Sequence, residues 1–215
     1  MSTAAHADPY RIGGSEGLAT GHGTGGPASK RVVVGFGFWI FLLSDVVMFS
    51  ALFATYAVLA RATADGPGAK EIFHRGPLAI QTAALLASSF CCGLASLAVE
   101  RRSRLWTQAA LSATALTGLV FVILEGLEFW QLIAAGDGPS RSAFLSAFFT
   151  LVGCHGLHVT LGGLWLATMM AQFFFKGFTQ TVRHRFLCFS LFWHALDIIW
   201  VAIFSLVYLA GLTLP

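Results

Sequence analysis

Five long apolar segments, none of which contains a lysine or an arginine, set the limits on this fold. They cover approximately residues 32–60, 77–99, 105–135, 142–175 and 186–211. A helix needs about 20 apolar residues to cross a bilayer, so each segment is long enough to span one. We therefore expect residues 31–215 to form an all-α, polytopic membrane bundle of five transmembrane helices.

The composition excludes the ordinary soluble classes of protein. Of the 215 residues, 56% are hydrophobic and only 11% are charged, whereas a typical soluble domain has about 25% charged residues. A soluble chain of this length could not bury so much apolar surface in a single core. The net charge is only +3 and no basic run occurs, so we expect no nucleic-acid partner.

The positions of lysine and arginine predict the orientation in the membrane. Residues 1–30 are rich in Gly, Ser and Thr and lack an apolar period, which is typical of a flexible tail. Nine of the 13 cationic residues lie in or beside this tail and in the loops after the second and fourth segments. Because such loops stay in the cytoplasm, we expect a cytoplasmic N-terminus and a periplasmic C-terminus.

Ionisable side chains within the apolar segments are the candidate functional residues, because such groups are costly at membrane depth. Several are spaced three residues apart, which places both members of a pair on one side of a helix. The candidates are Asp45 alone, and the pairs Glu125 and Glu128, His155 and His158, and His194 and Asp197. With no cation inside the segments, the carboxyl groups must be protonated, hydrogen-bonded to His or Ser, or turned toward another subunit.

Four uses of these groups are open from the residues alone. A di-iron centre would need Glu-x-x-His motifs, which are absent. A b-type haem could use His155 or His158 together with His194, and a proton path could use Asp45 or the Glu pair. The alternative that we favour is hydrogen bonding between helices by neutral acids, His and Ser or Thr. The four cysteines lie in apolar runs without zinc-motif spacing and are interpreted as buried apolar side chains.

Three blocks of sequence resemble subunit III of the haem-copper respiratory oxidases. They are FGFWIFLLSDVVMFSALFATYAVL, SAFLSAFFTLVGCHGLHVTLGGLW and CFSLFWHALDIIWVAIFSLVYL, in that order, within residues 36–210. Within this family the chain is most similar to the cytochrome bo-type ubiquinol oxidase branch. It has five predicted spans rather than seven, and Leu187 stands where the cytochrome c branch carries a glutamate. A bacterial cytochrome c oxidase subunit III and a proton-coupled transporter are the alternatives.

The resemblance implies a bundle in which the first two spans are split from the last three around a lipid cleft. It also implies direct packing against subunit I, in a complex with subunits II and IV in the bacterial inner membrane. This chain would hold no haem, copper or quinone, since the haems and copper would lie in subunit I. The complex would oxidise ubiquinol, reduce oxygen to water and pump protons, and this chain would support assembly, lipid binding and proton uptake.

Individual residues also match the family. Asp45 matches its carbodiimide-reactive carboxyl group. The other matches to its characteristic polar positions, with structural, lipid-related or proton-related roles, are Glu128, His155, His158, His194 and Asp197. Independently, Arg183 and Arg185 precede the fifth segment on the expected cytoplasmic side. Each cation near an anionic leaflet adds about 1 kcal/mol of attraction, so both are candidates for binding phospholipid headgroups, and ordinary topogenic residues are the alternative.

Overall fold

Helices account for most of the chain that the computed structural model describes, which is residues 30–64, 66–72 and 75–213. They are α1 (Lys30–Leu59), α2 (Ala69–Ile72), α3 (Arg75–Glu100), α4 (Arg104–Ala134), α5 (Ala143–Lys176), α6 (Gln180–Ile203), the π-helix η1 (Phe204–Leu209) and α7 (Ala210–Thr213). Within these ranges there is no strand. Five helical segments are long and apolar enough to cross a membrane: α1, α3, α4, α5, and α6 continued by η1. The expected all-α class and its five spans are therefore confirmed.

The last long helix begins earlier than its apolar segment. α6 starts at Gln180, whereas the predicted span starts at residue 186. The Thr179 side chain caps the helix by accepting a hydrogen bond from the backbone N–H of Val182 at 3.4 Å. Because of this cap, the polar residues QTVRHR join the helix, which sequence hydropathy alone does not predict. The predicted flexible tail lies outside the described residues, except that α1 already begins at Lys30.

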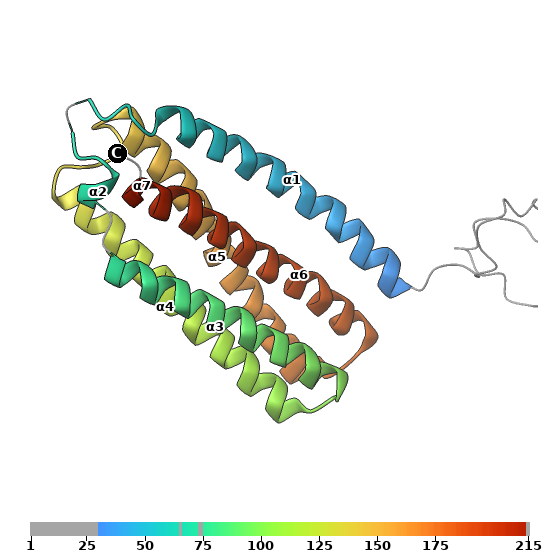
Figure 1. Ribbon diagram of the computed structural model, residues 1–215. Helices are drawn as coiled ribbons and strands as arrows, with labels where there is room; N and C mark the ends of the chain where they lie inside the picture. The colour runs from blue at the N-terminus through green and yellow to red at the C-terminus, as the bar shows by residue number, and fades with distance from the viewer. Residues whose placement is uncertain (1–29, 65, 73–74, 214–215) are drawn as a thin grey trace, which may run out of the picture.

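The long helices lie side by side, with α5 and α6 in the middle of the bundle (Figure 1). α3 and α4 form a hairpin on one side, where α4 packs against α5 and α3 packs against α6. α1 lies on the other side and packs against α5 and α6. The structure therefore does not show the predicted split of the first two spans from the last three around a lipid cleft.

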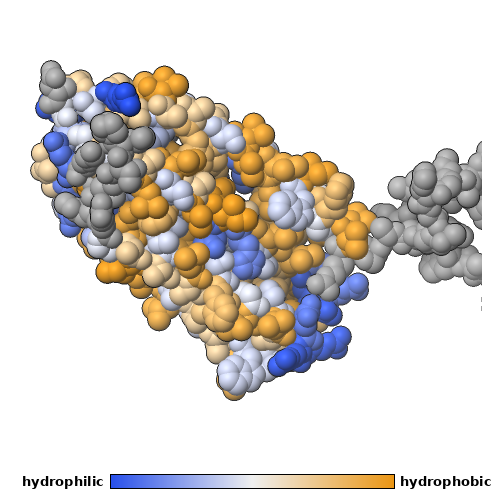
Figure 2. All heavy atoms as spheres, in the orientation of Figure 1, coloured by the Kyte–Doolittle hydropathy of each residue, from blue (hydrophilic) through white to orange (hydrophobic). Residues whose placement is uncertain are grey.

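The face of the bundle in Figure 2 is largely apolar along its length, and most of its strongly hydrophilic residues lie toward the two ends. Many large apolar side chains of the long helices are more than two-thirds exposed, among them Phe36, Val58, Leu105, Trp106 and Phe175. In a bilayer such side chains meet lipid tails, which are as apolar as they are. This surface fits a multi-pass membrane protein.

Trp193 of α6 holds the centre of the bundle together. A Cβ atom added at Gly118 of α4 or at Gly162 of α5 would lie 3.0 Å from its indole ring, so the two glycines make room for it. The indole N–H donates to Ser88 Oγ of α3 at 3.2 Å. Ser88 in turn donates to the Thr114 carbonyl of α4 at 2.9 Å. One side chain thereby connects four helices, as small residues at helix contacts allow.

Candidate functional site

The polar groups of α6 meet uncharged polar groups of α3. Ser89 Oγ and His194 Nδ1 share a hydrogen bond of 2.7 Å, and Asp197, half-buried one turn later, also interacts with Ser89. Further along the same contact, the Trp200 indole N–H donates to Thr82 Oγ1 at 3.2 Å. The His-Ala-Leu-Asp motif therefore lies at a hydrogen-bonded contact between two spans.

The two histidines of the fourth span lie in different surroundings. His155 is fully buried, its ring stacked on Trp200 with 5.3 Å between the centroids and met at its edge by Phe121 and Phe49. Neither of its ring nitrogens has a hydrogen-bond partner among the residues that the structure describes. His158 is half-buried, and its Nδ1–H donates to the Cys154 carbonyl of its own helix at 2.7 Å. Only His155 thus belongs to the core between α4 and α6.

Asp45 lies at the contact between α1 and α5. It is half-buried and interacts electrostatically with the Cys154 side chain. One turn further along α1, the Phe49 ring packs against His158, with 5.4 Å between the ring centroids. Asp45 and His158 therefore belong to the same helix contact, on the opposite side of α5 from the acids of α4.

The acids of α4 point to different neighbours although they share one side of the helix. Glu125 is 5% exposed and lies against Gly156 of α5, where any added Cβ would collide with the carboxyl group. Glu128 is half-buried and accepts a hydrogen bond of 3.0 Å from the Gln81 side-chain amide of α3. The spacing of three residues places Glu125 toward α5 and Glu128 toward α3.

The described residues show which ligands are available for a metal centre or a haem. They contain no group of three or more His, Cys, Asp or Glu side chains that could hold a metal ion. His155, the most buried candidate for haem ligation, packs against the rings of Trp200, Phe121 and Phe49. What these side chains do in the structure is bond one helix to the next.

The uncharged partners on α3 were missed by a search for ionisable groups. Gln81, Ser88 and Ser89 each bond a residue of α4 or α6. A sequence signal for them existed, because Gln81 and Ser88 are seven residues apart in an otherwise apolar segment and so lie on one helix face.

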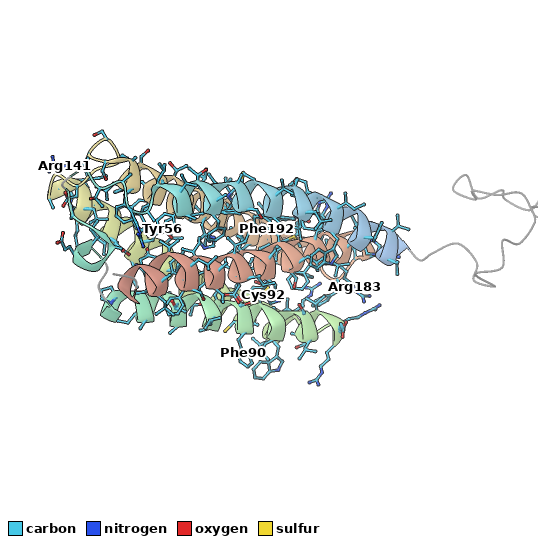
Figure 3. All side chains as sticks on the ribbon, turned by 45° about the horizontal axis from the view of Figure 1, so that its top comes forward. Tyr56, Phe90, Cys92, Arg141, Arg183 and Phe192 are labelled. Atoms are coloured by element: carbon cyan, nitrogen blue, oxygen red, sulfur yellow. The ribbon has the colours of Figure 1, made fainter. Side chains whose placement is uncertain are left out.

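Of the two candidate lipid-binding arginines, only Arg183 lines a cavity, which has a volume of about 400 Å³. It opens at the end of the bundle where α3 ends and α6 begins. Arg102, Arg183 and His184 line it, together with the carboxyl-bearing Glu100. Figure 3 shows Arg183 at this end of the bundle and Arg141 at the other. Arg185 does not line the cavity; it is exposed and donates to Gln172 Oε1 of α5 at 3.1 Å.

The fold and its polar contacts define a multi-pass helical membrane protein whose buried polar groups join helices. Residues 15–212 match the family described as cytochrome c oxidase subunit III. A relative from Pseudomonas aeruginosa, named cytochrome bo(3) ubiquinol oxidase subunit 3, is 51% identical over 176 residues, which cover 82% of this chain and 84% of the relative. The chain therefore belongs to the cytochrome c oxidase subunit III family, and the resemblance seen in the sequence is confirmed.

The names of two relatives from other bacteria indicate different electron donors. Quinol oxidase subunit 3 of Bacillus subtilis is 42% identical over 176 residues, covering 82% of this chain and 86% of the relative. Cytochrome c oxidase subunit 3 of Bacillus sp. (strain PS3) is 39% identical over 180 residues, covering 82% and 85%. The similarity is thus greater to the relatives named as quinol oxidase subunits.

Proposed function

We propose that this chain is the non-catalytic subunit III of a proton-pumping bacterial haem-copper ubiquinol oxidase. The observation that carries the proposal is the 51% identity with a relative named as subunit 3 of such an oxidase. The complex oxidises ubiquinol and reduces oxygen to water, with its haems and copper in subunit I. This chain packs against subunit I beside subunits II and IV in the inner membrane, and it supports the stability and assembly of the complex.

Purification through a tag on this chain tests the proposal. From mild detergent, the chain should carry with it a partner that has a haem-copper absorbance spectrum and that oxidises ubiquinol in preference to reduced cytochrome c. Preference for cytochrome c would instead support the alternative that the 39% identical relative suggests. Recovery of the chain without any haem protein would refute the oxidase proposal.

The orientation is the first testable prediction. Arg101, Arg102 and Arg104 lie at the turn between α3 and α4, at the same end of the bundle as the start of α1 (Figure 1). Because cationic loops stay in the cytoplasm, a reporter enzyme that works only in the periplasm should be silent when fused within residues 101–103. The same reporter should be active when fused after Pro215. The reverse pattern would overturn the orientation.

The second prediction concerns phospholipid. We propose that Arg183, with Arg102 and His184, binds an anionic headgroup in the cavity that they line. Arg183→Ala should reduce the phospholipid that co-purifies with the complex and make this subunit easier to strip with detergent, while early oxidase turnover stays near normal. Arg185→Ala is the matched control, since Arg185 bonds Gln172 instead. Equal lipid content in both variants would leave these arginines only a topogenic role.

The third prediction concerns Asp45, which we propose to be the carbodiimide-reactive carboxyl group of this chain and to support proton uptake. Asp45 is half-buried in a membrane span, where a hydrophobic carbodiimide can reach it, whereas Glu125 is 5% exposed and lies against Gly156 of α5. Labelling should therefore concentrate at Asp45 and disappear in Asp45→Asn, with electron transfer retained. Mass spectrometry of the labelled peptides measures this, and equal labelling of Glu125 and Glu128 would contradict it.

A further inference from the structure

The Glu125 carboxyl group occupies a place that the bundle keeps open for it. The atoms nearest to a Cβ built at Gly156 are all carboxyl atoms of Glu125, including Cδ at 2.9 Å and Oε2 at 3.2 Å. A glycine that only allowed close helix packing would have backbone or apolar atoms as its neighbours. Gly156 instead leaves room for the Glu125 carboxyl group between α4 and α5. The resemblance to oxidase subunit III assigns no role to Glu125.

Several buried polar atoms around this carboxyl group have no partner within the described chain. They are Glu125 Oε2, Gln81 Oε1 and both ring nitrogens of His155, on residues that are 0–5% exposed. Gln81 reaches the group through its bond to Glu128, one turn after Glu125. His155 directly precedes Gly156, the glycine against which the Glu125 carboxyl group lies. Since buried polar atoms in proteins almost always have a partner, ordered water is the group that fits here.

The π-helix brings a further polar group to the same place. η1 contains Tyr208, which is 1% exposed, packs against Trp200 and Phe148, and interacts electrostatically with both Glu128 and Glu125. A π-helical turn shifts the following side chains around the helix axis, and such turns are frequent at functional sites. The Tyr208 phenol therefore belongs to the same group of polar side chains as Gln81, Glu125 and Glu128.

One of these polar residues, Glu128, also lines a cavity near one end of the bundle. The cavity has a volume of about 400 Å³ and is lined by Glu71, Gln131 and Asp137 as well. It has room for several water molecules, each of which occupies about 30 Å³ in the liquid. Because Glu128 both lines the cavity and bonds Gln81, it stands between the open water and the buried groups.

We propose that Gln81, Glu125, Glu128 and Tyr208 enclose an internal hydration site, in which ordered water links the Glu125 carboxyl group to the cavity beside Glu128. The Glu125 carboxyl O–H gives its proton to a neighbouring ordered water molecule and receives another proton from it. The carboxyl group is therefore neutral again after each exchange. The site lies within this chain and does not depend on which electron donor the complex uses.

Infrared spectroscopy of the assembled complex tests the exchange. Wild type should show a C=O band of a protonated carboxyl group that Glu125→Gln removes, and this band should shift within minutes of transfer to D2O. Glu128→Leu should slow the shift by about tenfold, since it removes a hydrogen-bonding step of ordinary strength. Gln108→Leu is the control, because Gln108 is on the same helix but outside the cavity and bonds the Met170 carbonyl of α5, and it should leave the rate unchanged.

Two further measurements keep the proposal open to refutation if Glu125→Gln does not assemble. Gly156→Ala should move the Glu125 band, whereas Gly163→Ala should not, because a Cβ at Gly163 meets nothing within 4 Å. A high-resolution cryo-electron microscopy map of the wild-type complex should show water about 3 Å from Glu125 Oε2. A band that stays unshifted in D2O for hours, or a map with no water at this carboxyl group, would overturn the proposal.

Discussion

Gly162→Leu should prevent this subunit from accumulating in its complex, whereas Gly163→Leu should accumulate normally. A Cβ at Gly162 would lie 3.0 Å from the Trp193 ring and 3.1 Å from Phe192, and the bulk of a leucine would push α6 away from α5. Overpacking of a filled core typically costs about 1–3 kcal/mol, occasionally more. Here it would also strain the hydrogen bond from Trp193 to Ser88 of α3.

The neighbouring glycine makes this comparison a controlled one. Both substitutions put the same side chain into the same helix turn, so intrinsic helix preference changes equally. Only Gly162 is packed, since nothing lies within 4 Å of a Cβ at Gly163. Immunoblots of membranes and of the purified complex would measure the outcome. Equal accumulation of the two variants would show that Trp193 does not hold the bundle together in the way described.

Trp200→Ala should lower the thermal stability of the subunit more than any substitution on the lipid-facing sides. Trp200 is fully buried, packs edge-on against Phe121 at 4.6 Å, stacks on His155 and bonds Thr82. Replacing a buried Trp with Ala typically costs about 3–5 kcal/mol, mostly through the cavity it leaves. That packing loss remains in a membrane protein, because lipid cannot fill an enclosed cavity.

Two comparison variants show what part of the loss comes from packing. Trp200→Phe keeps most of the ring but not the bond to Thr82, so it should cost only about 1 kcal/mol. Trp106→Ala removes a side chain that is 69% exposed and should leave stability close to that of wild type. The midpoint of thermal unfolding in detergent distinguishes these cases. A Trp106→Ala loss as large as that of Trp200→Ala would contradict the assigned core.

The spans were predictable because bilayer thickness and apolar run length are directly linked. α4 (Arg104–Ala134), for example, follows from a long, mainly apolar segment without an internal lysine or arginine. The neighbours of each helix were not predictable in this way, since hydropathy carries no information on which spans touch. The expected pairing of the first two spans came from family resemblance, whereas α1 packs on α5 and α6 and α3 packs on α4.

The polar positions were predictable as costly groups, but their partners were not. Spacing placed His155 and His158 on one side of α5, yet a separation of three residues still turns them apart, so that one enters the core and the other bonds its own backbone. The π-helix that carries Tyr208 leaves no mark in the apolar pattern. The contacts of the uncharged residues Gln81 and Ser89 depend on how α3 packs against α4 and α6, and the sequence of α3 alone does not reveal that packing.

We propose that this chain supports an oxidase without holding a redox centre, and removing the chain tests this proposal most directly. The oxidase should be purified from cells that express all its other subunits, with and without this one. We predict equal haem and copper per subunit I in both preparations and similar initial rates of ubiquinol oxidation, followed by a faster loss of activity during turnover where the chain is missing. Loss of a full equivalent of haem or copper, or of the initial rate, would contradict the account.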